Sequence, residues 1–137
     1  MTGEFTTEHF GFALPYAVAN AVTNAADVDL TLTGGNTLMV MPKAGSVIGI
    51  AVRATADLTA GSATFEAHKD GTEFADTSAP VLTLSDTVQE SYASVRRGAL
   101  KFAAGEAIGV SYSSSTDAAP TNTNDYDAVL FVAFDND

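Results

Sequence analysis

The sequence predicts an all-β, antiparallel sandwich, and two features of the chain lead to that prediction. Short runs rich in β-branched and aromatic residues recur along the 137 residues, separated by segments of Gly, Asn, Asp, Ser and Pro. Several runs alternate apolar and polar side chains, as strands with one covered face do. Cysteine is absent, so disulfides and zinc–thiolate sites are excluded. The length suits a single domain.

The first 14 residues differ from the rest of the chain. Phe5, Phe10 and Phe12 stand among polar residues with no sustained period. Chain termini are disordered unless they are tied down, and three phenylalanines in a loose tail would be a liability. We therefore expect residues 1–14 to form an arm that docks on a neighbouring molecule, or a first edge strand. Residues 15–137 are expected to form the sandwich domain.

The next segments lead from an ambiguous stretch into a hairpin. Residues 15–24 fit either a strand or a short helix. Residues 28–32 alternate apolar and polar side chains, which indicates a strand. Residues 34–36, Gly-Gly-Asn, tolerate positive φ and favour a tight turn. Residues 37–41 are then expected to run back along the first strand.

The segment from residue 46 to residue 74 is the most regular part of the chain. Ile48, Ile50 and Val52 line one face of the strand over residues 46–53. Residues 63–68 form a further strand, and Asp70-Gly71 is a strong two-residue hairpin signal. We expect that turn to pair Ala67 with Phe74 and to place Phe65 and Phe74 on one buried face.

Four further strands and a long loop follow. Residues 81–84 and 92–95 flank a polar turn, and residues 99–103 and 107–112 flank an Ala-Gly-Glu turn. Residues 113–124 are polar and rich in turn residues, which indicates a long surface loop.

Residues 127–135, Asp-Ala-Val-Leu-Phe-Val-Ala-Phe-Asp, form the last predicted strand. Alternation along a strand places Val129, Phe131 and Ala133 on one face. The other face carries Ala128, Leu130, Val132 and Phe134. Both faces are apolar, so the strand must be covered either by a second layer of the same chain or by another subunit. About eight strands at regular spacing favour a jelly roll.

The charge of the chain excludes two classes of partner. Seventeen acidic residues against six basic ones give a formal net charge of −11 at pH 7. Nucleic acids and anionic lipids repel such a chain, so we expect neither a nucleic-acid nor a membrane partner. The N-terminus lacks the basic region and apolar core of a signal peptide, and synthesis in the cytoplasm is expected.

Several segments resemble a known group of proteins. These are residues 41–53, 58–65, 69–71 and 100–110. They resemble small jelly-roll domains of tailed-phage virion proteins, namely capsid decoration (cement) proteins and fibre tips, and are more distantly similar to trimeric domains of the C1q and tumour-necrosis-factor type. The likeness covers roughly residues 38–134, and its turns mark the fold more than a function.

The resemblance implies a homotrimer in which flat, small-residue or apolar strand faces pack about a threefold axis. The expected trimer interface contains Gly49, Ala51, Val129, Leu130, Phe131 and Val132. The expected capsid-docking residues are Phe5, Phe10 and Phe12 in the arm, and the basic residues Arg96, Arg97 and Lys101. Pairing of these basic residues within the chain is an equal alternative.

No motif in the sequence indicates catalysis. His9 and His68 are the only histidines and lack metal-ligand spacing, so we expect His68 to face solvent from a strand. The pairs Asp27/Asp29, Asp125/Asp127 and Asp135/Asp137 offer oxygen ligands for Ca²⁺, but they lack the Asp-x-Asp-x-Asp-Gly loop. We expect no enzyme activity, no cofactor and no bound metal.

The expected function is that of a non-enzymatic virion structural protein. A homotrimeric decoration protein would bind the major capsid protein on the outer surface of a phage capsid and stabilise the shell. Little precedes the domain, whereas fibre domains usually follow a stalk. The alternative is a fibre-tip domain that binds a receptor or glycan through the loop 113–124 or through Tyr16, Tyr112 and Tyr126. A bacterial adhesion or matrix domain is a third option, disfavoured by the missing signal peptide.

Overall fold

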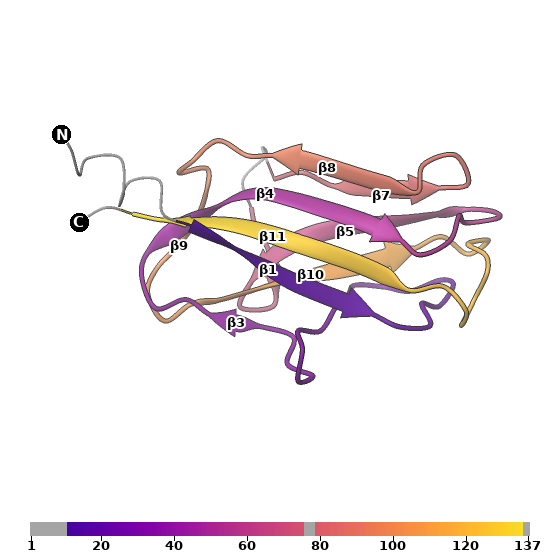
Figure 1. The fold of residues 1–137 in the computed structure, drawn as a ribbon, viewed down its shortest axis with the longest axis horizontal. Coiled ribbons are helices and arrows are strands. Elements are labelled where there is room, and N and C mark those ends of the chain that lie inside the picture. The colour runs from indigo at the N-terminus through magenta and orange to yellow at the C-terminus, as the bar shows by residue number, and fades with distance from the viewer. Residues whose placement is uncertain (1–10, 76–78, 136–137) are drawn as a thin grey trace.

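The computed structural model describes residues 11–75 and 79–135, and within them the regular structure is entirely β (Figure 1). No helix that could span a membrane occurs in these residues. The strands are β1 (Gly11–Val18), β2 (Val28–Asp29), β3 (Met39–Val40), β4 (Gly45–Ala54), β5 (Ser62–Lys69), β6 (Thr72–Glu73), β7 (Leu82–Ser85), β8 (Glu90–Ser94), β9 (Leu100–Phe102), β10 (Ala107–Ser114) and β11 (Tyr126–Phe134).

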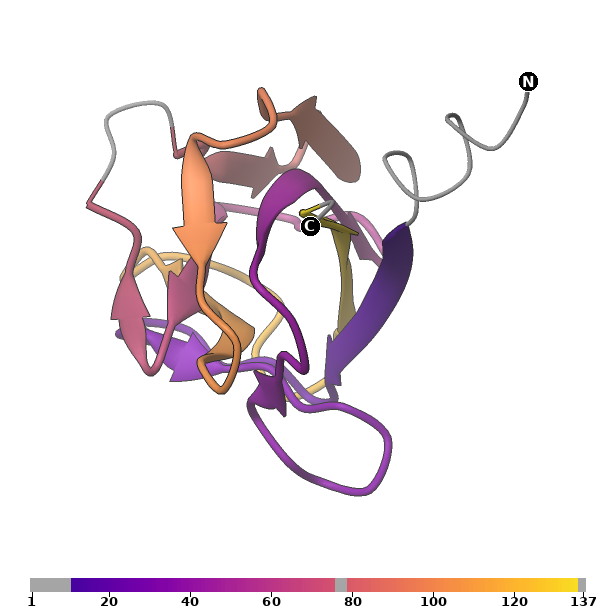
Figure 2. The ribbon, with the colours of Figure 1, turned by 90° about the vertical axis from the view of Figure 1, so that its left-hand side faces the viewer.

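The strands form two antiparallel sheets that pack face to face (Figures 1 and 2). Sheet A has the order β1-β11-β4-β8, and β9 also pairs with β4. Sheet B has the order β2-β10-β5-β6, with β3 beside β10 and β7 beside β5. The chain crosses between the sheets after β1, β3, β4, β7, β9 and β10, so consecutive strands often lie in different layers. This connectivity is a jelly roll, and the fold class predicted from the sequence is confirmed.

The last strand, β11, lies in the middle of sheet A because it pairs with β1 on one side and with β4 on the other. Leu130 and Val132 point between the sheets and are 0% and 1% exposed. Val129 and Phe131 point away from sheet B. Between Phe131 and Val132 the pairing with β4 shifts by one residue, because β4 carries one extra residue there, Ile48. One apolar face of β11 therefore packs in the core, and the other lies on the outer side of sheet A.

Aromatic side chains fill the space between the sheets. The Phe65 ring contacts Tyr112 and Tyr126, with ring centroids 6.1 and 5.2 Å away, and the two tyrosine rings are 5.4 Å apart. The Tyr16 hydroxyl of β1 donates a 2.7 Å hydrogen bond to the carbonyl oxygen of Ile108 in β10, which connects sheet A to sheet B. Burial raises the pKa of Tyr16, so this hydroxyl remains a donor over the ordinary pH range.

The loop between β10 and β11 is held down by hydrogen bonds. The Asn124 side chain accepts hydrogen bonds from Thr55 Oγ1 and Ala56 N, both at 3.1 Å, and donates one to Ala56 O at 2.9 Å. Ala119 exchanges backbone hydrogen bonds with the β4–β5 connection, donating to Ala60 and accepting from Thr59. The polar loop predicted at residues 113–124 is therefore an anchored part of the fold, and its first two residues belong to β10.

The predicted Asp70-Gly71 turn is confirmed. The residues flanking the turn, Lys69 and Thr72, pair directly, and Asp70 and Gly71 have φ values of 53° and 87°, as a two-residue hairpin turn requires. Phe65 is fully buried and Phe74 packs against the core, which agrees with the expected face.

The hairpin predicted over residues 28–41 is wrong. Gly34 and Gly35 do turn the chain with positive φ. However, β2 and β3 pair with successive parts of β10 and not with each other. Local turn residues identify the turn, but they do not determine which strand supplies the hydrogen bonds.

Residues 11–14, assigned from the sequence to an arm or edge strand, lie in β1, the edge strand of sheet A. The boundary expected after residue 14 therefore falls inside a strand. Phe5 and Phe10 lie outside the described residues.

Candidate interaction surface

The outer face of sheet A, the side turned away from sheet B, carries two rows of small and apolar residues. Strand register places Ala13, Phe131, Gly49 and Ser94 side by side across β1, β11, β4 and β8. The next row consists of Pro15, Val129, Ala51 and Tyr92. We call these two rows the apolar face.

Two large side chains stand out on the apolar face. Tyr92 is 84% exposed and Phe131 is 41% exposed. The Phe131 ring lies beside Gly49, because an added Cβ at that glycine would be 3.4 Å from Phe131 Cδ2. Shallow, mostly apolar hollows flank Tyr92 on both sides. An exposed aromatic pair on a flat apolar patch is typical of the centre of a protein–protein interface.

A charged row borders the apolar face toward the β10–β11 loop. Asp127, Arg53 and Glu90 occupy neighbouring positions on β11, β4 and β8. The Arg53 Nε atom lies 3.6 Å from Glu90 Oε2, and both side chains are largely exposed. An apolar centre with a charged edge matches the usual anatomy of an interface.

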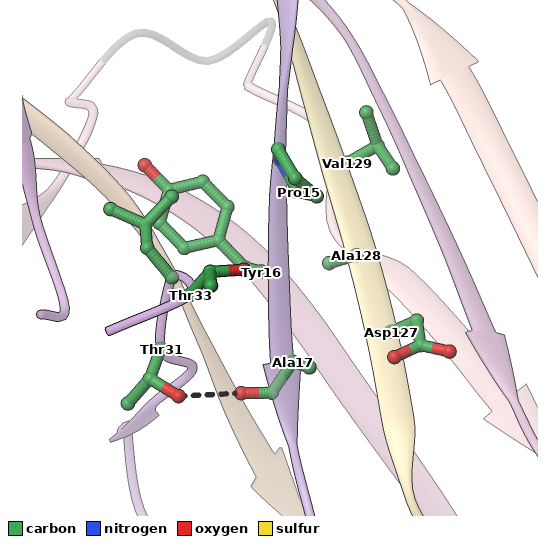
Figure 3. A pocket seen from close by; sticks show the side chains of 9 residues that line it. Pro15, Tyr16, Ala17, Thr31, Thr33, Asp127, Ala128 and Val129 are labelled. Carbon is green, nitrogen blue, oxygen red and sulfur yellow. Dashed lines mark hydrogen bonds between the residues drawn. The ribbon is translucent and has the colours of Figure 1, made fainter. Parts of the chain in front are cut away.

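The free edge of β1 is protected against pairing with another strand. Ala17 and Thr31 exchange 2.8 Å backbone hydrogen bonds, so the backbone groups of Pro15, two residues earlier, also point to that edge. Proline has no N–H to offer there. Figure 3 shows Pro15 and Val129 on one side of the sheet and Tyr16 on the other, next to an open groove that also includes Thr31 and Thr33. The geometry favours contact through the sheet face and disfavours strand addition at this edge.

The expected trimer residues divide between two surfaces. Gly49, Ala51, Val129 and Phe131 lie on the apolar face. Leu130 and Val132 are buried in the core, so their assignment to a subunit interface is wrong. Because both faces of β11 are apolar, the sequence does not distinguish the side that sheet B covers from the outer side.

The structure places the expected docking residues in different environments. Phe12 points inward and packs on Phe134, with ring centroids 5.1 Å apart, so its assignment to docking is corrected. The Arg97 guanidinium donates a hydrogen bond to the carbonyl oxygen of Phe134, which is pairing within the chain. Arg96 and Lys101 are exposed. Phe5 lies outside the described residues, as does Phe10.

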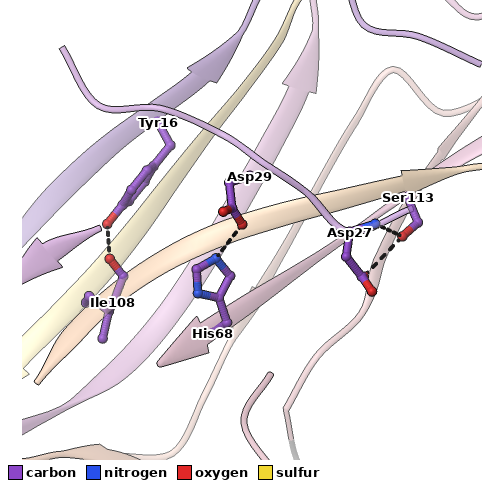
Figure 4. Close-up of polar contacts among 6 residues, drawn as sticks. All are labelled: Tyr16, Asp27, Asp29, His68, Ile108 and Ser113. Carbon is purple, nitrogen blue, oxygen red and sulfur yellow. Dashed lines mark hydrogen bonds and ion pairs between the residues drawn. The ribbon is translucent and has the colours of Figure 1, made fainter. Parts of the chain in front are cut away.

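The outer face of sheet B carries acidic residues and a histidine. His68 and Glu66 point outward from β5, Glu73 lies on the neighbouring strand β6, and Asp29 lies on β2, on the other side of β10. Asp27, beside Ser113, adds a further carboxylate (Figure 4). Among the described residues, the exposed aromatic side chains, Tyr92 and Phe131, both lie on the outer face of sheet A.

His68 is 1% exposed, so the expectation that it faces solvent is wrong. Its Nε2 atom lies 3.3 Å from Asp29 Oδ1 (Figure 4). The segment that follows the Gly34-Gly35 turn covers this part of the sheet, because an added Cβ at Gly109 would be 2.5 Å from Thr37 O and 2.7 Å from His68 Cε1. The absence of a side chain at Gly109 leaves room for the imidazole ring. His9 lies outside the described residues.

Burial and the neighbouring carboxylates Glu73 and Asp27 raise the pKa of Glu66. A raised pKa in the folded state means that ionised Glu66 disfavours folding. The stability that protonation provides is present below the ordinary glutamate pKa and is lost as the pH rises through the raised value.

We expect Glu66→Gln to raise the melting temperature near neutral pH by about 1–2 °C, the change that a few tenths of a kcal/mol produces in a domain of this size. Thermal melts at several pH values should show the difference shrinking as the buffer becomes acidic enough to protonate Glu66 in both states. Asp57→Asn, at an exposed position on a different loop, is the control. An equal gain for both variants, independent of pH, would contradict the assignment.

The tyrosines proposed to stack on sugars are unavailable for that role. Tyr16, Tyr112 and Tyr126 are 2%, 2% and 3% exposed and belong to the core. The described residues contain no group of three or more His, Asp or Glu side chains placed to hold a metal ion.

The chain was compared with known proteins. It matches no protein-family model and no curated protein. Among solved structures, it aligns with a chain of the cyanophage Pam1 capsid asymmetric unit at a TM-score of 0.50 and 14% identity, over 98% of this chain and 91% of that chain. The fold resembles one found in a phage capsid. At this identity the likeness concerns the fold alone.

Two further alignments have lower scores. A chain of turnip yellow mosaic virus aligns at a TM-score of 0.45 and 12% identity, over 90% of this chain and 92% of that one. The PRD1 vertex protein P5 aligns at a TM-score of 0.45 and 13% identity, over 90% of this chain and 73% of that one.

Sequence analysis missed Tyr92, Ala13 and Pro15 as members of the apolar face. Their strands, β8 and β1, flank the central pair of sheet A through contacts distant in sequence. The available signal was Tyr92 itself, a large aromatic residue between Ser91 and Ala93 in a short strand.

Proposed function

We propose that the chain is a non-enzymatic structural protein of a virion, which forms a homotrimer and decorates the outer surface of a phage capsid. The observation that carries the proposal is the apolar face, where Phe131 and Tyr92 stand exposed among Gly49, Ala51 and Val129. In an isolated chain this face would expose an apolar patch to water. Contact with other copies of the chain removes that patch from water.

One consideration supports the virion role and another supports the trimer. The alignment with a chain of the cyanophage Pam1 capsid asymmetric unit spans nearly all of this chain. The jelly-roll decoration domains and C1q-like domains that the sequence resembles are trimeric, which favours a closed ring of three over a dimer. In a closed ring of three, each copy presents one part of its face to one neighbour and another part to the other neighbour, so all three apolar faces are covered.

The stabilising action follows from mass action. A trimer that binds assembled shells better than free capsid subunits shifts the equilibrium toward the shell, and a trimer offers several attachment points at once. The chain needs no reactive group to act in this way.

The test of this function is binding to capsids. Shells assembled from the major capsid protein of the virus that encodes the chain are mixed with the purified protein, pelleted and imaged by electron cryomicroscopy. The proposal predicts threefold density on the outer surface of the shell and a higher temperature of shell disruption. Protein that stays in the supernatant, or that locates only to tail fibres, would contradict it and favour the receptor-binding alternative.

A further inference from the structure

The charges of the described residues divide sharply between the two ends of the sandwich. One end, which we call the β9 end, is where β4 begins, β11 finishes and β9 lies (Figures 1 and 2). The opposite end, which we call the far end, holds the β1–β2, β4–β5, β7–β8 and β10–β11 connections. The ten-residue strand β4 spans about 30 Å between them.

Five of the six basic residues of the chain lie at the β9 end. Lys43 precedes β4, Lys69 ends β5, Arg96 and Arg97 connect β8 to β9, and Lys101 lies in β9 opposite Ser46. The described carboxylates at this end are Asp70, Glu73, Glu106 and Asp135. With five cations and four carboxylates, the described part of this end has a formal charge of +1.

The far end is strongly acidic. Its one described cation is Arg53, which pairs with Glu90. Its described carboxylates are Asp27, Asp57, Asp86, Glu90, Asp117, Asp125 and Asp127. Seven carboxylates and one cation give a formal charge of −6, so the charges of the described residues are strongly asymmetric along the strands.

Some of the charged residues at the β9 end line a shallow hollow. It is lined by Lys69, Lys101, Phe102, Glu106 and Asp135, with Ala44 and Ala103 between them. Lys69 Nζ lies 3.6 Å from Glu106 Oε1, whereas Lys101 is exposed beside the hollow. Basic and acidic groups alternate here, which suits ion pairs with a protein surface of defined shape. A nucleic acid would need an uninterrupted basic groove.

We propose that the β9 end is the docking end of the molecule, and that its partner is an acidic protein surface reached chiefly through Arg96 and Lys101. This inference rests on the proposed function, in which that surface belongs to the capsid shell. The far end then faces solvent, where its negative charge keeps decorated particles apart.

The proposed trimer strengthens the asymmetry. Rotation about an axis along the strands keeps the same end of every copy at the same pole, so three β9 ends would lie together. Three weak, mixed-charge contacts then act as one multivalent attachment. The β9 end is also where β1, the first described strand, begins.

The test compares two variants with the same net charge. Arg96→Gln/Lys101→Gln lowers the charge by two at the β9 end, and Thr59→Glu/Thr123→Glu lowers it by two at exposed positions of the far end. Arg97 is left unchanged because its guanidinium holds the Phe134 carbonyl. Co-sedimentation with the capsid shells measures affinity from about 50 to about 500 mM NaCl, where screening weakens exposed ion pairs.

We expect the β9-end variant to lose about tenfold in affinity, the far-end variant to stay within about twofold, and binding of the unmodified chain to weaken as salt rises. Equal affinities for the two variants would overturn the docking end and leave the proposed function standing. No binding by the unmodified chain would overturn both. Binding of a DNA duplex that the β9-end substitutions abolish would replace the acidic protein surface by a nucleic acid.

Discussion

Phe131→Glu is expected to leave the chain folded and to abolish its self-association. Phe131 is 41% exposed at the centre of the apolar face, so the substitution removes little packing from the single domain. In a trimer the same position is covered, and a carboxylate there must lose its hydration against an apolar surface. That penalty amounts to several kcal/mol, so the dissociation constant should rise by at least about a hundredfold.

The measurement is a sedimentation-velocity series over protein concentration, with circular dichroism to confirm the fold. Val81→Glu is the matched control, because Val81 is 54% exposed on a different part of the surface and receives the same charge. We expect Val81→Glu to associate like the unmodified chain. If Phe131→Glu associates normally, the copies meet through another surface and the apolar face has a different occupant.

Leu130→Ala is expected to produce the opposite result, a large loss of fold stability. Leu130 is the neighbour of Phe131 on β11, but it is 0% exposed and lies between the two sheets. Truncating a fully buried leucine typically costs about 3–5 kcal/mol, from lost burial and the cavity that remains. Urea denaturation monitored by circular dichroism measures this loss.

The control for that experiment is Val129→Ala, one position away and facing outward. In the Phe131→Glu background, where association no longer contributes to stability, we expect Val129→Ala to cost less than about 1.5 kcal/mol. Similar losses for Leu130→Ala and Val129→Ala would show that β11 does not separate a core side from an outer side.

Local signals predicted much of the fold. The Asp70-Gly71 hairpin was predicted because positive φ at two successive residues and the alternation of residues 63–68 are properties of neighbouring residues. The strand character of residues 126–134 was equally local. A jelly roll followed from the number and spacing of such strands.

The sequence did not predict which strands pair with each other or which face of each strand is buried. Residues 28–41 have good turn chemistry, yet β2 and β3 both pair with β10, about 70 to 80 residues away along the chain. Leu130 and Phe131 are both strongly apolar, so their chemistry does not indicate which of them is buried and which is exposed. His68 is covered by the segment near Thr37, whose path over sheet B depends on the same long-range pairing.

The residues of the apolar face were also predicted only in part. Gly49, Ala51, Val129 and Phe131 were predicted from a resemblance and from the excess of apolar strand surface. Tyr92 and Pro15 joined them only through the register of four strands. The end-to-end charge asymmetry likewise required the topology, because its cations are spread from Lys43 to Lys101 in the sequence.

The account depends most on the claim that copies of the chain cover each other's apolar faces. Sedimentation equilibrium of the purified, unmodified protein tests that claim directly. We predict a mass three times the 14.1 kDa of one chain, maintained on dilution into the low micromolar range. A mass of one chain at every concentration, with Tyr92 and Phe131 open to solvent, would contradict it.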